Sequence, residues 1–316
     1  MSTIAALRCP AGDVVSIFGL CFTIKHGLRN QLNGYRSFIN LKIRKIDGVT
    51  IPSPDTTIWR YVSYARFEQM IQESSIYLAR LDQFSDFNEG TLTKAMQRRN
   101  QEEMEIQGAK DLDSIIPFIH QFFNHKYWYV SCWNSDKTQS NLLWRSYGTP
   151  KKDDKYQFKV AIKSSVAKLI NSINVDNLYL GKVNYLDFEK DDPFIGSDGI
   201  ESGSLVYTKQ HEYKEENEIR LAFHDTASMC GGFLANLPKT EKGITVPVNL
   251  SLLLDEVYIE AFPVDWEKLG KNNTGTVDKE YKKGLCKKDD KQKSMIEVLF
   301  EKQQIQNVPI HRSSIL

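Results

Sequence analysis

The stretch YKEENEIRLAFHD, which spans Tyr213–Asp225, decides the fold class and raises the question of function. Its second half alternates apolar and polar side chains with the period of two that a β-strand requires. The apolar positions are Ile219, Leu221 and Phe223, and the polar positions are Glu218, Arg220 and His224. Together with Glu216, two carboxylates and a guanidinium occupy every second position, so we expect them in one row on the solvent-facing side of a strand.

Outward from this strand, β-prone stretches and helical patterns mix without strict βαβ order. Strands are predicted over residues 57–62, 75–81, 126–133, 158–163, 177–186, 244–250, 256–262 and 307–315. Helices are predicted over residues 64–74, 91–107, 111–123, 140–148, 164–173, 251–254 and 295–302. This order favours one α+β domain with a largely antiparallel sheet, continuous or split, flanked by helices. We expect the domain to span residues 51–316, after an N-terminal extension of residues 1–50 and with a mobile, Lys-rich insertion at about residues 268–293.

The net charge of +1 conceals an uneven distribution along the chain. Residues 1–50 and residues 268–293 each carry a net charge of +5, whereas residues 51–267 carry −9. Because an acidic body repels a phosphate backbone, a nucleic-acid partner would have to use the basic ends, which could equally serve a protein partner.

Several kinds of site leave no trace in the sequence. The number of cysteines, five, is odd and no two have CxxC spacing, so a reducing cytoplasm fits better than a disulfide framework or a zinc site. P-loop, GxGxxG, HExxH and GxSxG sequences are missing and the six histidines are scattered, so we predict no metal. The apolar run Val14–Ile24 has eleven residues, which is too short to span a bilayer, and no membrane segment is expected.

Four segments combine charged and aromatic side chains in a way that a plain core does not require. They are IWRYVS (residues 58–63), DQFSDFNEG (residues 82–90), SCWNSDKTQSNLLWRSYG (residues 131–148) and KQHEYKEENEIR (residues 209–220). Each also has a purely structural interpretation: an edge-strand arginine, an acidic turn, an aromatic core, and a salt-bridge ladder on the wet face of a strand. Alternatively, two Trp near a turn-rich loop can form one wall of a pocket for a flat ring.

Taken in order, these segments resemble an uncharacterised bacterial family, domain-of-unknown-function family 2971. The family pattern has an aliphatic-aromatic-basic-Tyr strand (here IWRY), an L-x-x-F-x-D-P-F-E-G-like turn (LDQFSDFNEG), an SC-aromatic strand with an N-x-x-x-W-x-x-Y-G-like continuation (YVSCW, NLLWRSYG) and K-x-x-x-aromatic-x-x-E-x-E-x-R (KQHEYKEENEIR). Asp86 and Glu89 match the turn, whereas Phe87 replaces the usual Pro and Tyr213 the usual Trp. The resemblance covers about residues 56–265 and implies no activity, because the family has none assigned.

The chain is also similar, in outline, to the ADP-ribosyltransferases. In that family an Arg or His on an early strand, a Tyr or Ser in the middle and a late Glu, often as E-x-E, carry the chemistry. Arg60, Tyr147 and the pair Glu216-x-Glu218 occur here in that order. The similarity implies cleavage of NAD, as co-substrate, by a transferase or glycohydrolase.

In that interpretation Glu218 stabilises an oxocarbenium-like ribose and Glu216 orients or deprotonates the acceptor. Arg60 would fork onto a phosphate or ribose oxygen, and Tyr147 and Trp144 would stack on nicotinamide. Arg220 would keep Glu218 ionised. The further candidates for substrate contact are Tyr61, Asp86, Glu89, Trp133, Trp144 and Lys209.

Two other classes of function stay open. The acidic body and the aromatic segments also suit a non-catalytic module that binds a nucleotide or a protein, with the Lys-rich stretch as its recruiting arm. A nuclease could gather Asp86, Glu89, Glu216 and Glu218 around Mg²⁺, although no D-x-n-E-x-K signature is present. A bacterial defence or toxin role would suit families of this kind, but no residue indicates it.

Overall fold

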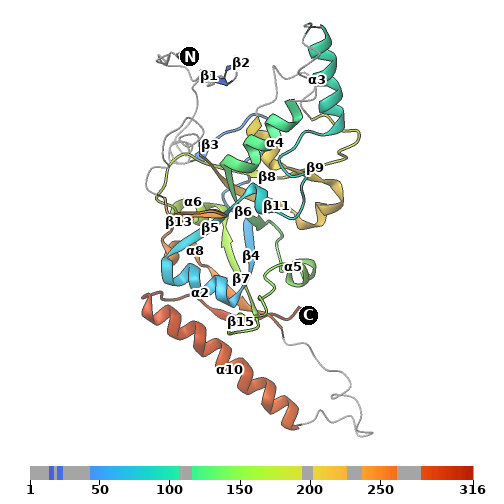
Figure 1. The fold of residues 1–316 in the computed structure, drawn as a ribbon. Coiled ribbons are helices and arrows are strands. Elements are labelled where there is room, and N and C mark those ends of the chain that lie inside the picture. Colours follow the sequence, from blue (N-terminus) through green and yellow to red (C-terminus); the bar gives the residue numbers. More distant parts are fainter. Residues whose placement is uncertain are drawn as a thin grey trace, which may run out of the picture.

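The computed structural model describes residues 14–17, 20–23, 43–106, 108, 116–193, 202–225, 237–261 and 279–315. Helices lie around a mixed sheet of 11 strands, which confirms the predicted α+β fold class (Figure 1). Among the residues described, no helix has the length and apolar character that a bilayer crossing needs.

The sheet forks at its central strand, β6 (Trp128–Asn134). One edge of β6 pairs along its whole length with β11 (Glu218–His224), and the sheet continues on that side through β8 (Leu178–Lys182) to β3 (Ile43–Arg44). The other edge pairs first with β5 (Ser75–Arg80) and then, at Asn134, with β4 (Thr57–Ser63). The sheet is therefore split, as the sequence allowed, and it is largely antiparallel.

Two branches leave the fork. One runs from β5 to β13 (Gly243–Pro247) and β12 (Lys239–Thr240), and the other runs from β4 to β7 (Lys159–Ser165), β14 (Glu256–Ile259) and β15 (Ile310–Arg312). Outside this sheet, β9 (Asn184–Leu186) pairs in parallel with β10 (Thr208–Gln210), and β1 (Val14–Ile17) pairs with β2 (Leu20–Thr23).

Helices connect and cover the strands. They are α2 (Tyr64–Glu73), α3 (Lys94–Ile106), α4 (Ile116–Tyr127), α5 (Asn141–Ser146), α6 (Val166–Ser172), α8 (Leu250–Leu253) and α10 (Lys279–Lys302), with the 3-10 helices η1 (Leu81–Gln83), η3 (Ser202–Tyr207) and η4 (His211–Glu216). The N-terminus of α2 is capped by the Ser63 side chain, which accepts a hydrogen bond from the Arg66 amide. The helix ends at Ser74, whose left-handed backbone (φ 47°) turns the chain into β5.

Both faces of the central strands are buried. Ile219 and Leu221 of β11 join the main core, which α2, α6, α8 and α10 help to form. Ala222 of β11 joins a second cluster on the opposite face with Trp128, Val130 and Tyr207. The expected solvent-facing row on β11 is therefore wrong, because other segments cover that face: Glu218 is 6% exposed and Arg220 is fully buried.

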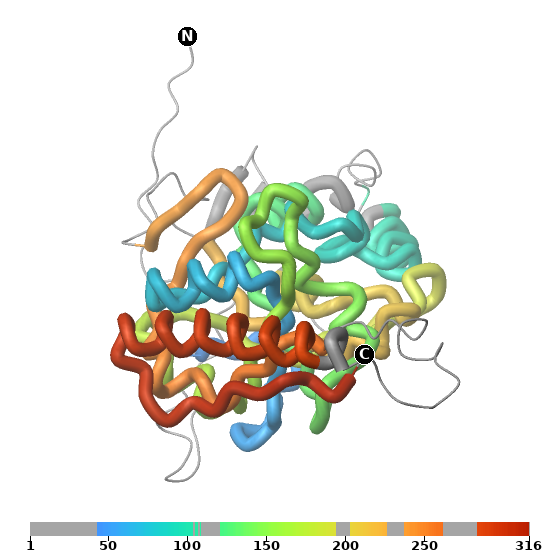
Figure 2. The backbone as a smooth tube through the Cα atoms, turned by 90° about the horizontal axis from the view of Figure 1, so that it is seen from below, coloured from blue at the N-terminus to red at the C-terminus, as the bar shows by residue number. Residues whose placement is uncertain are grey.

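The Lys-rich segment also differs from the prediction. Residues 262–278 lie outside the described part of the chain, but the segment is helical from Lys279, and α10 continues to Lys302 alongside α2 (Figure 2). Its apolar side chains Ile296, Leu299 and Phe300 recur at helical spacing and pack into the core. At the other end, β3 precedes the expected domain boundary at residue 51 and still belongs to the sheet.

Candidate functional site

Five charged side chains from two of the four sequence segments meet on the second face of β11. This ionic cluster consists of Glu89, Lys209, Glu216, Glu218 and Arg220. Glu89 comes from the turn after η1, Lys209 from β10, Glu216 from the end of η4, and the last two from β11. All five were candidates from the sequence, and the structure brings them into direct contact.

Arg220 lies at the buried centre of the cluster. Its Nε donates to Oε1 of Glu218 at 2.8 Å, and its Nη2 contacts Oε2 of Glu218 at 3.2 Å and also Oε2 of Glu89. Nη1 donates to the Val206 carbonyl at 2.6 Å. The planar guanidinium thereby satisfies two carboxylates and one backbone oxygen at once, which a lysine at this position could not do.

Lys209 closes the cluster on the side nearer the surface. Its Nζ lies 2.6 Å from Oε2 of Glu216 and 3.4 Å from a carboxylate oxygen of each of the other two glutamates, Glu89 and Glu218. It also lies 4.8 Å from the ring centroid of Tyr213, within the range of a cation–π contact. One ammonium group therefore contacts all three carboxylates.

Glu216 does not extend the row of β11 side chains, as the sequence suggests it should. Asn217 has a left-handed backbone (φ 41°) that ends η4, so the strand begins only at Glu218. The carbonyl of Glu216 accepts a hydrogen bond from the Asn134 side chain at 2.8 Å, and Oε1 accepts one from the Tyr147 hydroxyl at 2.7 Å. Glu216 thus joins η4, β6 and the residue that follows α5.

Burial and mutual charge set the pKa values in the cluster. Burial by itself would raise the pKa of Glu218, but Arg220 and then Lys209 outweigh it and lower that pKa to about 2. In Glu89, burial prevails over the attraction of Arg220, and the nearby charge of Glu218 adds to the rise in its pKa. The pKa of Lys209 is raised, because Glu218 and Glu89 more than offset its burial. Glu89 is therefore the buried carboxylate that takes up a proton first on acidification.

The cluster contains three carboxylates but only two cations, which leaves an excess of one negative charge when all five groups are ionised. The side chain of Glu216 is 12% exposed, against 4% for Glu89 and 5% for Glu218, so the excess charge meets solvent at Glu216. Tyr147 and Tyr213, which are 38% and 37% exposed, stand beside it.

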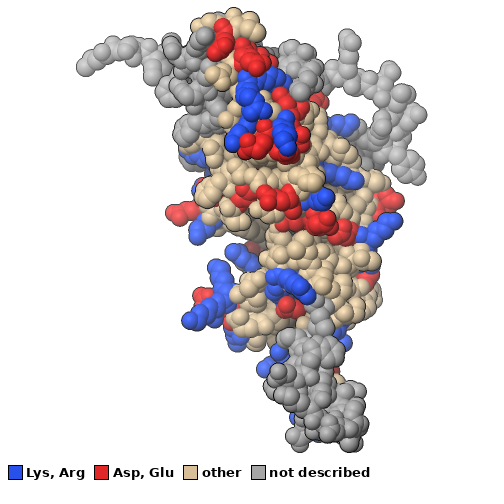
Figure 3. Space-filling view, turned by 90° about the vertical axis from the view of Figure 1, so that its right-hand side faces the viewer, with Lys and Arg blue, Asp and Glu red and all other residues tan. Residues whose placement is uncertain are grey.

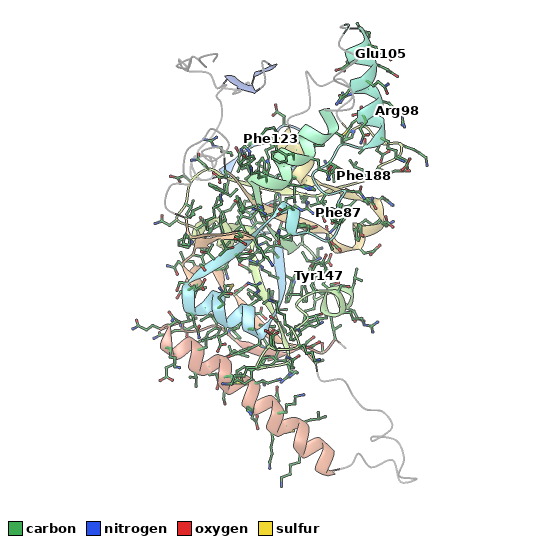
Figure 4. The ribbon with its side chains drawn as sticks, in the orientation of Figure 1. Phe87, Arg98, Glu105, Phe123, Tyr147 and Phe188 are labelled. Atoms are coloured by element: carbon green, nitrogen blue, oxygen red, sulfur yellow. The ribbon has the colours of Figure 1, made fainter. Side chains whose placement is uncertain are left out.

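The surroundings of Glu216 are acidic and aromatic. Figure 3 shows acidic side chains gathered across the middle of this face, with uncharged surface below them. Glu212 and Glu215 of η4 are exposed, and Phe87 of the acidic turn is 75% exposed. Figure 4 places Phe87 and Tyr147 on the same side of the molecule. A cationic or aromatic group that approached this face would find complementary charge and stacking surface.

Arg60 lies outside the ionic cluster. Trp59 pairs with Asn134, and in an antiparallel sheet paired residues share a face, so Arg60 points to the face opposite Glu218 and Arg220. Its Nη2 donates to the Tyr77 carbonyl, and its guanidinium lies 5.6 Å from the Trp133 ring centroid. Burial lowers the pKa of Arg60 to about 10. The expectation that this arginine shares one site with the two late glutamates is therefore corrected.

The aromatic candidates other than Tyr147 are core residues. Trp133 is 1% exposed in the main core, and Trp144 packs edge-on against Tyr61 with ring centroids 5.1 Å apart in a separate small core. Neither Trp forms the wall of an open pocket. Asp86 does not join the ionic cluster. Its side chain accepts a hydrogen bond from the backbone N–H of Asn88 within the same turn. The structural interpretation of the aromatic segment was thus the better one.

Two residues of the site escaped sequence analysis. The hydroxyl of Tyr185 in β9 accepts a hydrogen bond from the backbone N–H of Glu218 at 2.8 Å, and burial raises the pKa of Tyr185. Asn217 provides the left-handed turn described above. An Asn between two glutamates is a recognisable turn signal, whereas nothing in the sequence relates Tyr185 to Glu218.

Within the described ranges, no group of three or more His, Cys, Asp or Glu side chains has the geometry to hold a metal ion. The three carboxylates of the ionic cluster surround Lys209 and Arg220 instead. No protein-family model matches the chain, and no curated protein sequence matches it significantly.

Proposed function

We propose that this chain is a binding module whose site is Glu216 with Tyr147 and Tyr213, and that the site takes a cationic side chain of a protein partner. The observation that carries the proposal is the excess of one carboxylate over the cations, which reaches solvent at Glu216 (side chain 12% exposed), next to Tyr147, which bonds to it, and Tyr213, which contacts Lys209. An alkyl guanidinium or ammonium would complete the charge balance and gain contact with the tyrosine rings.

One buried member of the cluster and one surface tyrosine hold the binding carboxylate in place. Lys209 and Tyr147 each occupy one oxygen of Glu216, so the carboxylate is fixed before a partner arrives. A preorganised site spends less binding free energy on ordering its own side chains. Each carboxylate oxygen can still accept a second hydrogen bond, because an ionised carboxylate has about four acceptor positions.

The test compares two peptides by calorimetry, one with a single central arginine and one with citrulline, its neutral isostere, at that position. We expect the arginine peptide to bind and the citrulline peptide to fail. Glu216→Gln should remove binding, while Glu212→Gln, which deletes the same charge from an exposed position on η4, should retain most of it. Equal binding of the two peptides, or an equal loss in both variants, would refute the proposal.

A second candidate is cleavage of NAD, as the similarity to ADP-ribosyltransferases implies. The observation in its favour is the contact of Tyr147 with Glu216, two residues before Glu218, which joins two of the three expected positions. Against it, Arg60 lies on the other face of the sheet, and Lys209 and Arg220 are occupied by carboxylates. Nicotinamide release from NAD, measured with and without lysate as acceptor, decides between the candidates: release that disappears in Glu218→Gln supports the enzyme, and none at all supports the module.

Membership of domain-of-unknown-function family 2971 also stays a proposal, supported by the order and spacing of the four segments. Three of those segments supply the ionic cluster and its Tyr147 contact. A nuclease is the least supported class, because a divalent cation would have to displace Lys209 from between the carboxylates.

A further inference from the structure

The exposed side of α10 carries a row of lysines at helical spacing. Lys283, Lys287 and Lys291 follow one another at intervals of four residues, and all three are exposed. At 3.6 residues per turn they fall within a sector of about 80° on the helix surface. The buried residues of the same helix, Gln292 and Ile296, fall on the opposite side.

This row is unfavourable for the helix itself. Like charges at i,i+4 destabilise a helix by about 0.2–0.5 kcal/mol per pair, and the row contains two such pairs in succession. Further along α10 the exposed charges are Glu297 and Glu301, with Lys302 in the last turn, so the run of lysines alone ends at Lys291 on the exposed side. Asp290, three residues after Lys287, offsets part of this cost, but the row as a whole does not stabilise the helix.

The N-terminal end of α10 extends away from the sheet. In Figure 1 the helix runs past the lower end of the molecule, whereas Ile296, Leu299 and Phe300 of its C-terminal half pack into the core, and Asp289 and Gln292 near its middle contact Arg312 of β15. Asp289 is the acid nearest the packed side of α10, and its side chain pairs with Arg312 of β15 and with Lys293 of the same helix. Asp290 is the acid nearest the lysine row on the exposed side.

We infer that the lysine row of α10, Lys283, Lys287 and Lys291, binds the phosphate backbone of a double-stranded nucleic acid. The eight residue steps from Lys283 to Lys291 span about 12 Å at 1.5 Å per residue. Over that length a duplex presents about seven phosphates, at one charge per 1.7 Å, so each lysine has a phosphate within reach. The binding is independent of base sequence and of the site at Glu216.

A second copy of the chain is the less favoured occupant, although its acidic middle is also complementary in charge. A basic helix on an acidic face of another copy is a heterologous contact, which propagates into open filaments unless the rotation closes a ring. Nothing in the described residues provides such closure.

The test measures the affinity of the full chain for a labelled 20-base-pair DNA by anisotropy between 50 and 200 mM salt. The triple variant Lys283→Gln, Lys287→Gln and Lys291→Gln should flatten the slope of log K against log salt by about 2.7, from about 0.9 per phosphate contact. The matched control removes three exposed lysines from the loop between α5 and β7, through Lys151→Gln, Lys152→Gln and Lys155→Gln. It should change the slope little. Circular dichroism is the check that both variants keep their helices.

Three results would overturn the inference. The first is that the wild-type chain does not bind DNA at 50 mM salt. The second is that the two triple variants change the salt slope equally. The third is that the wild-type chain binds poly-glutamate as tightly as it binds DNA that carries the same number of charges. The last result would identify an acidic protein surface as the partner. Sedimentation that shows self-association lost only in the α10 variant would identify a second copy.

Discussion

Replacement of Arg220 by methionine is the most direct test of the ionic cluster. The substitution replaces the aliphatic stem with an unbranched apolar chain but removes the guanidinium, and it leaves Glu89 and Glu218 in a buried site with Lys209 as their remaining cation. Removal of one partner from a buried ion pair typically costs about 3–5 kcal/mol, because the other charge stays buried without compensation. We therefore expect the free energy of unfolding to fall by about 4 kcal/mol near pH 8.

The pKa of Glu218 gives a second, separate route to this magnitude. A drop from 4.5 to about 2 corresponds to about 3 kcal/mol of stabilisation at neutral pH, at 1.36 kcal/mol for each pH unit. Because the folded-state pKa is the lower one, this stabilisation is present above pH 4.5 and is lost as the pH falls toward 2. Arg220 is the strongest of the favourable contributions to that shift, so its removal should forfeit most of the stabilisation.

The assay is urea unfolding of wild type and Arg220→Met at pH 8 and pH 5.5. In the variant, the pKa values of Glu89 and Glu218 should both rise, so at pH 5.5 the carboxylates can take up protons and part of the loss is recovered. Arg60→Met is the matched control: this arginine bonds to the Tyr77 carbonyl, not to a carboxylate, so its loss should be the same at both pH values. A loss below about 1 kcal/mol in Arg220→Met, or one that does not depend on pH, would refute the reasoning.

Three further substitutions probe single contacts, each by urea unfolding. Gly148→Ala should cost about 1–3 kcal/mol, because φ is +66° and a Cβ would lie 2.7–2.8 Å from the Val62 backbone; an unchanged midpoint would contradict this. Ser63→Ala should cost about 1 kcal/mol through loss of the α2 cap, whereas Ser63→Thr should cost less. Tyr147→Phe should cost about 1 kcal/mol by removing the hydrogen bond to Glu216, and the double variant with Glu216→Gln should show that the two effects are not additive.

The period of two in Glu218–His224 was sufficient to predict a strand and its apolar face. It was insufficient to predict the environment of the other face, because alternating charges look the same whether solvent or other segments cover them. The covering residue Glu89 is 131 positions away from Arg220, and no local pattern encodes that contact. Once the turn and β10 cover the face, the same charges must neutralise one another.

The α10 segment was misjudged for a different reason. The spacing of Ile296, Leu299 and Phe300 predicted a helix over residues 295–302, but the Lys-rich composition before it resembles a disordered insertion, so the helix was not extended back to Lys279. Helix formation propagates cheaply once a packed turn exists, so the apolar end supports the charged beginning. The placement of Arg60 was misjudged because three short patterns in the right order do not determine which face of a sheet each residue occupies.

The ionic cluster is a poor device for stability alone. Apolar side chains of similar volume would fill the same space without the cost of desolvating five charges, and replacements of that kind in buried ion pairs are often neutral or stabilising. One structural benefit is that the cluster fixes the register of β11. Arg220 lies opposite Cys132 of β6 on one side and opposite Gly181 of β8 on the other. A slip of β11 by one residue would carry the buried charges into the main core. Register, however, requires only matched charges. An additional carboxylate at the exposed end, held by Lys209 and Tyr147, adds nothing to that specificity, and it is this surplus at Glu216 that points to a cationic partner.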